Sequence, residues 1–280
     1  MTAVAVPARI ADEEMQRLLE AIYETYHYDF RGYASASLKR RANLALIRLG
    51  CQTVPLLQQR MLRDPAAFAV LLSYLTVPVT EMFRDPEHFR ALRQRVVPVL
   101  RTYPSLKIWI AGCSTGEEAY SVAIMLREAE LLERSLIYAT DINAQSLQEA
   151  SAGVYGADRI AAYADSHRRS GATASLSDYY TAAYGRAVFD QGLRRHIVFA
   201  DHSLATDSVF AEVQLVLCRN VLIYFDRALQ DRAIGLFREA LCRRGFLALG
   251  LRESMRFSRH CGAFEEIDGT ARIYRRRDPS

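Results

Sequence analysis

Residues 111–121 read AGCSTGEEAYS and directly follow the apolar run LKIWI at 106–110. This pattern predicts a strand, a tight turn between Gly112 and Gly116, and then a helix. Such turns often bind phosphates, because backbone N–H groups and the helix dipole favour anions. Glu117 and Glu118 stand where a phosphate-binding loop would carry lysine, which favours a ligand with positive charge. The alternatives are a turn that only packs a helix on a sheet, and ordinary first-turn acids favoured by the dipole.

Strand-like and helix-like segments alternate from residue 106 onward. The predicted strands are 106–111, 135–140, 195–200, 212–218 and 246–251. The predicted helices span 117–132, begin again near Asn143, and run from Asp226 to Arg244, where Gly245 is expected to end the last one. Repeated strand–helix units predict a doubly wound parallel sheet with helices on both faces, an α/β fold.

The end of the chain breaks this alternation. The runs AFEEI (263–267) and TARIYR (270–275) flank Asp268-Gly269, a strong hairpin signal. A parallel sheet that finishes with an antiparallel hairpin is unusual among dinucleotide-binding proteins and is the expected ending of the class I methyltransferase fold. The sequence therefore favours that version of the doubly wound sheet.

The chain is predicted to have two domains. Residues 1–95 are expected to form a small all-α domain, and 96–280 the larger domain, with a small antiparallel insertion at about 153–193 around Tyr184-Gly185. In the helical part, the segment Ser37–Leu49 places its apolar residues on one face and three arginines beside it. That flank is either an ordinary solvated face or a docking surface for acidic helices; its residues are Arg40, Arg41 and Arg48.

Two further elements suggest what the glycine turn binds. Asp141 ends the second predicted strand, about 25 residues after the turn, where an acid accepts hydrogen bonds from ribose hydroxyls. It is alternatively a simple helix cap. The run CRNVLIYF (218–225) follows the fourth predicted strand, so Asn220 can direct an amide toward a ligand that Tyr224 and Phe225 wall, unless the run is only packing. A nucleoside with ribose, no phosphate and positive charge fits this set, and S-adenosylmethionine is such a molecule.

Bulk properties exclude several classes of protein. The chain has 280 residues, a net charge of +4, and five cysteines without a CxxC pair. These features predict reduced thiols and no metal site. The modest charge and the lack of an aromatic-and-basic module argue against a nucleic-acid partner. Residues 1–14 lack an apolar signal core, and no apolar run is long enough to span a bilayer. We therefore expect a cytoplasmic protein without direct membrane insertion.

Four motifs together resemble one family. They are TEMFRDPEHF (80–89), IWIAGCSTGEEAYSVAIML (108–126), YATDIN (138–143) and CRNVLIYF (218–225). In this order and at these places they resemble the CheR family, the chemotaxis receptor glutamate methyltransferases, and the resemblance covers nearly the whole chain. It implies transfer of methyl from S-adenosylmethionine to glutamate side chains on the cytoplasmic helices of chemoreceptors. It also implies that the small helical domain closes over the cofactor.

The resemblance implies a set of site residues. Arg84 and Tyr224 are the expected catalytic residues, and Met82 stands where the family usually has phenylalanine. Ser203-Leu204 replaces the family's usual Asn-Leu, so the shorter serine hydroxyl is expected to make a weaker contact. The expected cofactor-binding residues are Thr80, Arg84, Gly112, Glu117, Asp141, Ser203, Leu204, Asn220 and Val221.

Arg84 is expected to position a carboxylate, either the substrate's or the cofactor's own. Its structural alternative is an ion pair with Asp85 or Glu87. No catalytic base is required, because a glutamate carboxylate with a reference pKa near 4.3 is already ionised at pH 7. The alternative functions are a class I methyltransferase with another substrate, such as RNA or a small carboxylate, and a non-catalytic protein that senses S-adenosylmethionine.

Overall fold

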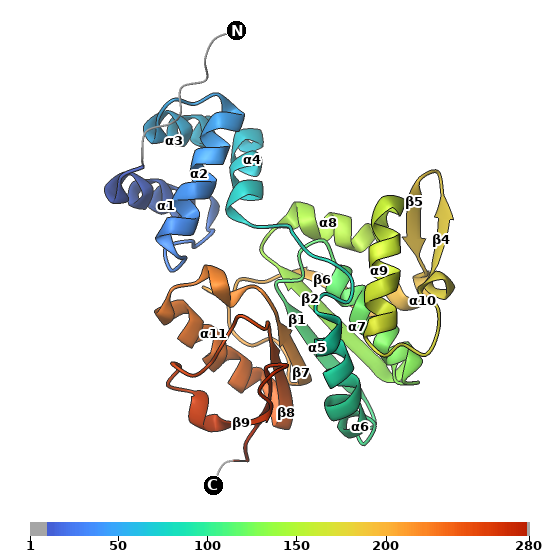
Figure 1. The fold of residues 1–280 in the computed structure, drawn as a ribbon. Coiled ribbons are helices and arrows are strands. Elements are labelled where there is room, and N and C mark those ends of the chain that lie inside the picture. Colours follow the sequence, from blue (N-terminus) through green and yellow to red (C-terminus); the bar gives the residue numbers. More distant parts are fainter. Residues whose placement is uncertain (1–9, 279–280) are drawn as a thin grey trace. The chain divides into compact units, whose positions relative to one another are not determined.

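The computed structural model describes residues 10–278, which form two compact units (Figure 1). The smaller unit comprises the described chain up to Pro78 together with Tyr224–Gln230. The larger unit comprises Val79–Ile223 and the described residues from Asp231 onward. Residues 1–9, part of the stretch in which the sequence shows no signal core, lie outside the described residues.

The smaller unit is built from four helices. Thr53 and Asp64 cap the third and fourth helices through their side-chain oxygens, and a proline follows each cap in the first turn. The segment Tyr224–Gln230 is bonded to this unit through the Ala34 N–H, which donates to the Tyr224 carbonyl at 2.8 Å. The helices are α1 (Asp12–Tyr26), α2 (Ser35–Leu49), α3 (Val54–Arg63) and α4 (Pro65–Leu75).

Residues 79–100 belong to the larger unit, whereas the sequence places the domain boundary near residue 95. They contain α5 (Pro86–Ala91), the π-helix η1 (Leu92–Val96) and α6 (Val97–Leu100). Phe89, Leu92 and Leu100 are fully buried in the core of this unit. The helical pattern of the sequence shows that these residues form helices, but not which core they pack against.

A seven-stranded mixed sheet forms the centre of the larger unit, in the order β6-β2-β1-β7-β8-β10-β9. The first five strands in this order are parallel, and β10 is antiparallel to both of its neighbours. The predicted sheet and its antiparallel hairpin ending are thereby confirmed. The strands are β1 (Leu106–Ala111), β2 (Ser135–Asp141), β6 (Ile197–Asp201), β7 (Val213–Cys218), β8 (Leu241–Leu249), β9 (Phe264–Asp268) and β10 (Ile273–Arg276).

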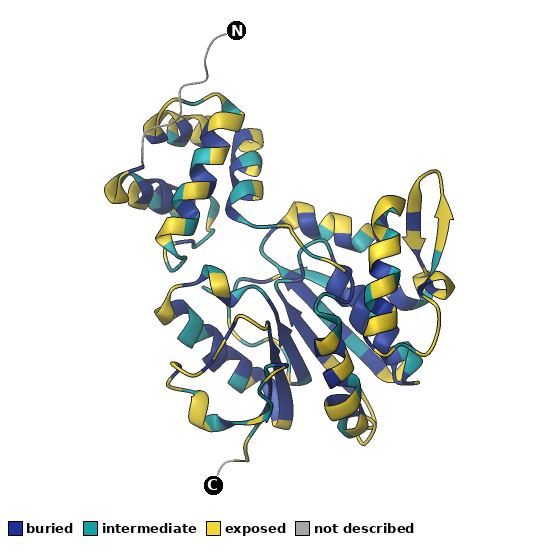
Figure 2. Cartoon of the chain, viewed as in Figure 1, coloured by how far each residue is buried: buried dark blue, intermediate teal, exposed yellow. Residues whose placement is uncertain are grey.

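Helices cover both faces of this sheet. Ile108 and Ile110 of β1 join the core cluster that contains α7 (Glu117–Glu128). Trp109, which points to the opposite face, packs edge-on against Phe237 of α11 (Arg227–Ala240) at 5.4 Å between ring centroids. Figure 2 shows the central strands mostly buried between these layers, whereas the edge strands β6 and β9 are only partly buried. The fold is therefore the doubly wound one that the sequence predicts. The helix α8 (Ala144–Ala152) follows β2, and the 3₁₀ turn η2 (Leu132–Arg134) lies directly before β2.

Two predicted helix ends are wrong. The helix that begins at Glu117 ends at Glu128, not at residue 132. α11 ends at Ala240 and β8 begins at Leu241, so Arg243, Arg244 and Gly245 lie in a strand. β8 pairs with β7 at Leu241 and again from Phe246, where it also pairs with β10, and a register shift spans the residues between. The strand pairing on both sides overrides the local signal of a glycine helix end.

The insertion contains a second sheet with the order β3-β5-β4. Tyr184 and Gly185 both have positive φ, 51° and 72°, as a two-residue hairpin turn requires. The sequence analysis did not predict the helix α9 that this region also contains. The elements are β3 (Val154–Gly156), α9 (Ala157–Arg169), η3 (Leu176–Tyr179), β4 (Tyr180–Ala183), β5 (Arg186–Phe189) and α10 (Gln191–Arg194).

Candidate cofactor site and active site

The turn after β1 is bonded to the end of β2. The N–H groups of Gly112 and Cys113 both donate to the Thr140 carbonyl, at 2.8 and 2.9 Å. The Ser114 N–H donates to Asp141 Oδ2 at 2.8 Å. Because parallel strands end at the same edge of a sheet, these contacts bring the glycine turn and Asp141 together where ligands of open α/β folds bind.

Glycine at position 112 allows a third loop to approach this turn. Its φ is 78°, and a Cβ there would lie 2.4 Å from Val221 Cγ2. Gly116, with φ of 91°, would place a Cβ 2.7 Å from the Cβ of Ala150 on α8. The conformation and the close packing both require glycine. Three expected cofactor-binding residues, Gly112, Asp141 and Val221, therefore lie at one edge of the sheet.

Asp141 is not the helix cap that was its alternative interpretation. Asn143 caps α8, with its side-chain oxygen accepting from the N–H groups of Gln145 and Ser146. Asp141 instead accepts the N–H groups of Ser114 and Asn143 on separate oxygens. Burial raises the pKa of its carboxyl, and these backbone bonds partly oppose that rise. A carboxylate offers about four acceptor positions, so these bonds leave capacity for a hydroxyl group of a ligand.

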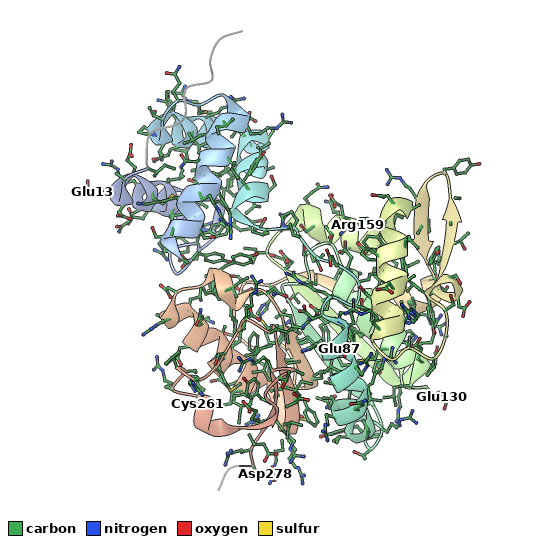
Figure 3. The ribbon with its side chains drawn as sticks, viewed as in Figure 1. Glu13, Glu87, Glu130, Arg159, Cys261 and Asp278 are labelled. Carbon is green, nitrogen blue, oxygen red and sulfur yellow. The ribbon has the colours of Figure 1, made fainter. Side chains whose placement is uncertain are left out.

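Glu117 is fully buried at the start of α7, and two of its partners come from the insertion. Its carboxylate accepts from the Thr115 hydroxyl at 2.7 Å, from Arg159 Nη1 at 3.2 Å and from the Tyr163 hydroxyl at 3.4 Å. Burial raises the pKa of the Glu117 carboxyl, against these hydrogen bonds. Arg159, which is labelled in Figure 3, also donates to the Thr80 carbonyl at 2.7 Å and so links two expected cofactor-binding positions.

The segment Thr80–Asp85 is attached to the sheet through buried polar groups. The Phe83 N–H donates to Ser121 Oγ at 2.9 Å. Arg219, directly after β7, donates to the Arg84 carbonyl at 2.8 Å and forms ion pairs with Asp85 and Glu118, both at 2.9 Å. Phe83 and Asp85 have positive φ, 51° and 55°, so the segment holds an uncommon backbone conformation.

These bonds leave the Arg84 guanidinium without a carboxylate partner among residues 10–278. Its one hydrogen bond is to the Val79 carbonyl at 3.5 Å. The alternative ion pairs do not form, because Asp85 binds Arg219 and Glu87 binds Arg90. Arg84 is therefore carried by a fixed backbone and has no carboxylate partner among residues 10–278, and its role in positioning a carboxylate stays a prediction.

Asn220 has a positive φ of 61°, a conformation in which asparagine is enriched. Its Oδ1 atom is buried and has no hydrogen-bond partner in the described structure, and the same is true of Ser114 Oγ. Buried polar atoms are normally paired, so such atoms at a sheet edge point to a missing ligand. The edge thus offers an amide, a hydroxyl and the Asp141 carboxylate to a ligand rich in hydroxyl and amino groups. The ribose, adenine and ammonium of S-adenosylmethionine fit this set.

Ser203 and Leu204 follow β6, next to Asp141. The preceding His202 N–H donates to the Asp141 carbonyl at 3.3 Å. Ser203 Oγ accepts the Ala205 N–H at 3.3 Å, and Leu204 is buried. The serine hydroxyl keeps its O–H donor and a second lone pair for a ligand. Its role in binding the cofactor stays a prediction.

Tyr224 belongs to the smaller unit, unlike the other expected site residues. There its ring lies 4.4 Å from the Arg41 guanidinium carbon. Arg41 is buried and donates to Ser37 Oγ at 2.8 Å and to the Leu75 carbonyl. It therefore cannot contribute to the proposed docking flank, to which the sequence analysis assigned it. The catalytic role of Tyr224 stays a prediction.

Sequence reasoning missed Arg159, Arg219 as an ion-pair centre, and Glu253, which binds the backbone of the Asn220 turn. Arg219 was visible only as a polar residue between two apolar runs. Within residues 10–278 no group of three or more metal-ligating side chains gathers, and no helix has both the length and the apolar character to cross a bilayer.

The fold and this edge define a class I methyltransferase. Residues 78–273 match the CheR methyltransferase, SAM binding domain, and residues 13–76 match the CheR methyltransferase, all-alpha domain. The chain belongs to the CheR methyltransferase family, and its cofactor is S-adenosylmethionine.

Three relatives illustrate the range of this family. The chain is 58% identical to the "Putative methyltransferase Cher3" of Pseudomonas putida, over 96% of this chain and 98% of the relative. It is 29% identical to a "Chemotaxis protein methyltransferase" of Listeria monocytogenes, over 79% and 82%. It is 28% identical to the "Probable biofilm formation methyltransferase WspC" of Pseudomonas aeruginosa, over 89% and 58%.

Proposed function

We propose that this protein transfers methyl groups from S-adenosylmethionine to glutamate side chains on the cytoplasmic helices of chemoreceptors, forming glutamyl methyl esters. The observation that carries the proposal is the Arg84 guanidinium, which has no carboxylate partner in the described structure although buried ion pairs fix its backbone. Chemotaxis methyltransferases among the relatives support the choice of substrate.

The chain's own residues are proposed to bind and orient the reactants. S-adenosylmethionine supplies a methyl group on a positively charged sulfur when it is bound. Asp141 accepts hydroxyl groups of the ligand, and Asn220 fixes its polar edge. Arg84 holds a carboxylate by paired hydrogen bonds. The attacking glutamate is already ionised near neutral pH, so orientation is the main contribution, and it can supply about 7–11 kcal/mol.

The test is incubation with methyl-labelled cofactor and receptor-containing membranes. We expect label that base releases as methanol, because that release is diagnostic of a glutamyl ester. The Arg84→Ala variant should lose about 100-fold in rate, as expected when a reactant loses its positioning group. Arg95→Ala is the matched control, because this exposed arginine of the same unit has no hydrogen-bond partner in the described residues.

The same variants show whether Arg84 binds the carboxylate of the cofactor or that of the substrate. If it holds the cofactor, Arg84→Ala weakens the binding of S-adenosylhomocysteine, which retains that carboxylate. If it holds the substrate, binding of S-adenosylhomocysteine is unchanged and only methyl transfer falls. Stable label in RNA or a small carboxylate, or no label in any acceptor, would contradict receptor glutamate methylation.

A further inference from the structure

Glu253, in the segment after β8, is almost completely buried, with 3% of its surface exposed. Its Oε2 accepts the N–H groups of Asn220 at 2.9 Å and Gly250 at 2.6 Å. Its Oε1 accepts those of Val221 at 2.8 Å and Ile223 at 3.4 Å. One carboxylate therefore binds four backbone donors, and three of them belong to the turn after β7.

Glu253 has no cation among its hydrogen-bond partners in the described structure. Burial of a carboxylate costs free energy unless hydrogen bonds compensate it, and here backbone N–H groups provide that compensation. Burial raises the pKa of the Glu253 carboxyl, and the four N–H groups oppose the rise. A glutamine would offer one acceptor oxygen and would turn an NH₂ group toward two N–H donors. A carboxylate therefore matches these four N–H donors better than a glutamine side chain does.

The turn that Glu253 binds carries two expected cofactor-binding residues. Asn220 has its φ at 61°, and its buried Oδ1 has no partner in the described structure. No protein group thus fixes that oxygen directly, so the direction of the amide depends on the backbone of the turn. Val221 is held against Gly112, where a Cβ would lie 2.4 Å from Val221 Cγ2. The backbone of this turn determines the geometry of the sheet edge.

We propose that Glu253 is a positioning residue for the cofactor, acting through the turn Arg219–Ile223 to aim the Asn220 amide and to place Val221 beside the glycine turn. This inference rests on the proposed role of Asn220 in binding the cofactor. It assigns to Glu253 an effect on ligand affinity that is separate from its contribution to folding.

The test measures S-adenosylhomocysteine affinity by calorimetry in Glu253→Gln, Asn220→Gly and the double variant. Glycine tolerates the positive φ of position 220 and removes only the amide. We expect each single change to raise Kd about tenfold. Because Glu253 acts in part through Asn220, the loss in the double variant should be smaller than the product of the two single losses.

Glu128→Gln is the matched control. Glu128 is also a buried carboxylate, but it binds His167 and Arg93 near the other end of α7. We expect it to lower thermal stability and leave Kd unchanged. Gly250→Ala provides a second route, because its Cβ would lie 2.6 Å from Glu253 Oε2 and 2.8 Å from the Asn220 N atom, and would disrupt the bond between them without changing the charge. It should also weaken binding, even where Glu253→Gln does not fold.

Three results would overturn the inference while wild-type protein binds the ligand normally. They are an unchanged Kd in Glu253→Gln or Gly250→Ala, multiplied losses in the double variant, and an equal loss in Glu128→Gln. If the wild-type protein itself binds no S-adenosylhomocysteine, the cofactor assignment fails, and this inference fails with it.

Discussion

Arg219 joins three parts of the larger unit through one guanidinium group. It binds Asp85 before α5, Glu118 on α7 and the Arg84 carbonyl, and its own side chain is only 2% exposed. Removing one member of a buried ion pair is costly, because the remaining charges lose their compensation. Arg219 therefore holds the segment that carries Arg84 beside the turn that carries Asn220.

We predict that Arg219→Met lowers the free energy of unfolding by about 3 kcal/mol, at the low end for buried pairs because Asp85 is partly exposed. Arg219→Lys should lose less, since it keeps the charge but lacks the planar fork that reaches three acceptors. Urea unfolding followed by the fluorescence of Trp109, the single tryptophan, measures both. Equal stability of the methionine variant and the wild type would show that the triad contributes nothing net.

Gly112 gives a second prediction at this scale. Gly112→Ala should cost at least about 2 kcal/mol of stability, from the positive φ and from the overlap with Val221 Cγ2. Adding Val221→Ala removes that methyl group, and the nearest remaining atom, Val221 Cβ, is then at an ordinary distance of 3.5 Å. The double variant should therefore lose less than the sum of the two single changes in the same unfolding measurement. Strict additivity would contradict the close contact between the two loops.

The residues that sequence reasoning identified and those that it missed differ in a physical way. Gly112 and Asp141 stand at strand ends, and strand ends are readable from local hydrophobic patterns. Glu253 contacts a turn about 30 residues earlier in the chain, and Arg159 contacts Glu117 from a helix 42 residues later. Neither has a local signature, because a buried acid in a loop and an arginine on a helix look like surface residues until the fold is known.

The boundaries of single helices show the same limit of local sequence patterns. α2 begins two residues before the predicted segment and ends with it at Leu49, and Leu38, Ala42 and Ala45 are buried as the apolar periodicity requires. The end of α11 does not follow, because the strand that takes over at Leu241 is defined by its partners in the sheet. Local signals thus define an element well where its own face is the dominant contact.

The arginines of α2 separate into two kinds. We predict that Arg41→Met lowers the stability of the smaller unit by about 1–3 kcal/mol, because it removes a charge-assisted hydrogen bond to the Leu75 carbonyl and the contact with Tyr224. Arg40→Met is the matched control on the same helix and should change stability by less than about 0.5 kcal/mol, as an exposed residue. Thermal unfolding followed by circular dichroism compares them.

A docking role for the α2 flank is then confined to Arg40 and Arg48, which are exposed. Charge reversal at both should slow methylation of acidic receptor helices and leave the Kd of S-adenosylhomocysteine unchanged. An unchanged methylation rate would make this flank an ordinary solvated surface.

Across the whole molecule, the cofactor edge concentrates carboxyls whose pKa is raised by burial: Glu117, Asp141 and Glu253. A raised pKa in the folded state means that the stabilising contribution of the group is full below its unfolded pKa. That contribution is lost as pH rises through the folded pKa. At neutral pH the ionised edge therefore costs stability. Ligand binding benefits from the same ionisation, since Asp141 must accept hydroxyl groups and Glu253 must accept N–H groups.

Ionisation of these carboxyls thus lowers folding stability and favours ligand binding, and this contrast gives a prediction about pH. As pH falls from 7 toward the ordinary carboxyl values of 3.8 and 4.5, protonation of Asp141 and Glu253 should begin above those values. The Kd of S-adenosylhomocysteine should rise over this range, and the increase in Tm that the ligand produces should shrink. The Tm of the ligand-free protein should fall less than the Tm of the ligand-bound protein, because protonating these groups favours the folded state. Calorimetric titration and thermal unfolding at matched pH measure the two effects.

The variant Asp141→Asn identifies the source of that dependence. An amide retains one acceptor oxygen and does not titrate, so this variant should bind more weakly at pH 7 and lose less affinity on acidification than the wild type. Glu128→Gln is the control, because the pKa of Glu128 is lowered, mainly by the hydrogen bond from His167 against the effect of burial. That carboxylate therefore stays ionised across the range. A Kd that is constant with pH in the wild type, or an identical pH profile in Asp141→Asn, would mean that ionisation of this edge does not control cofactor binding.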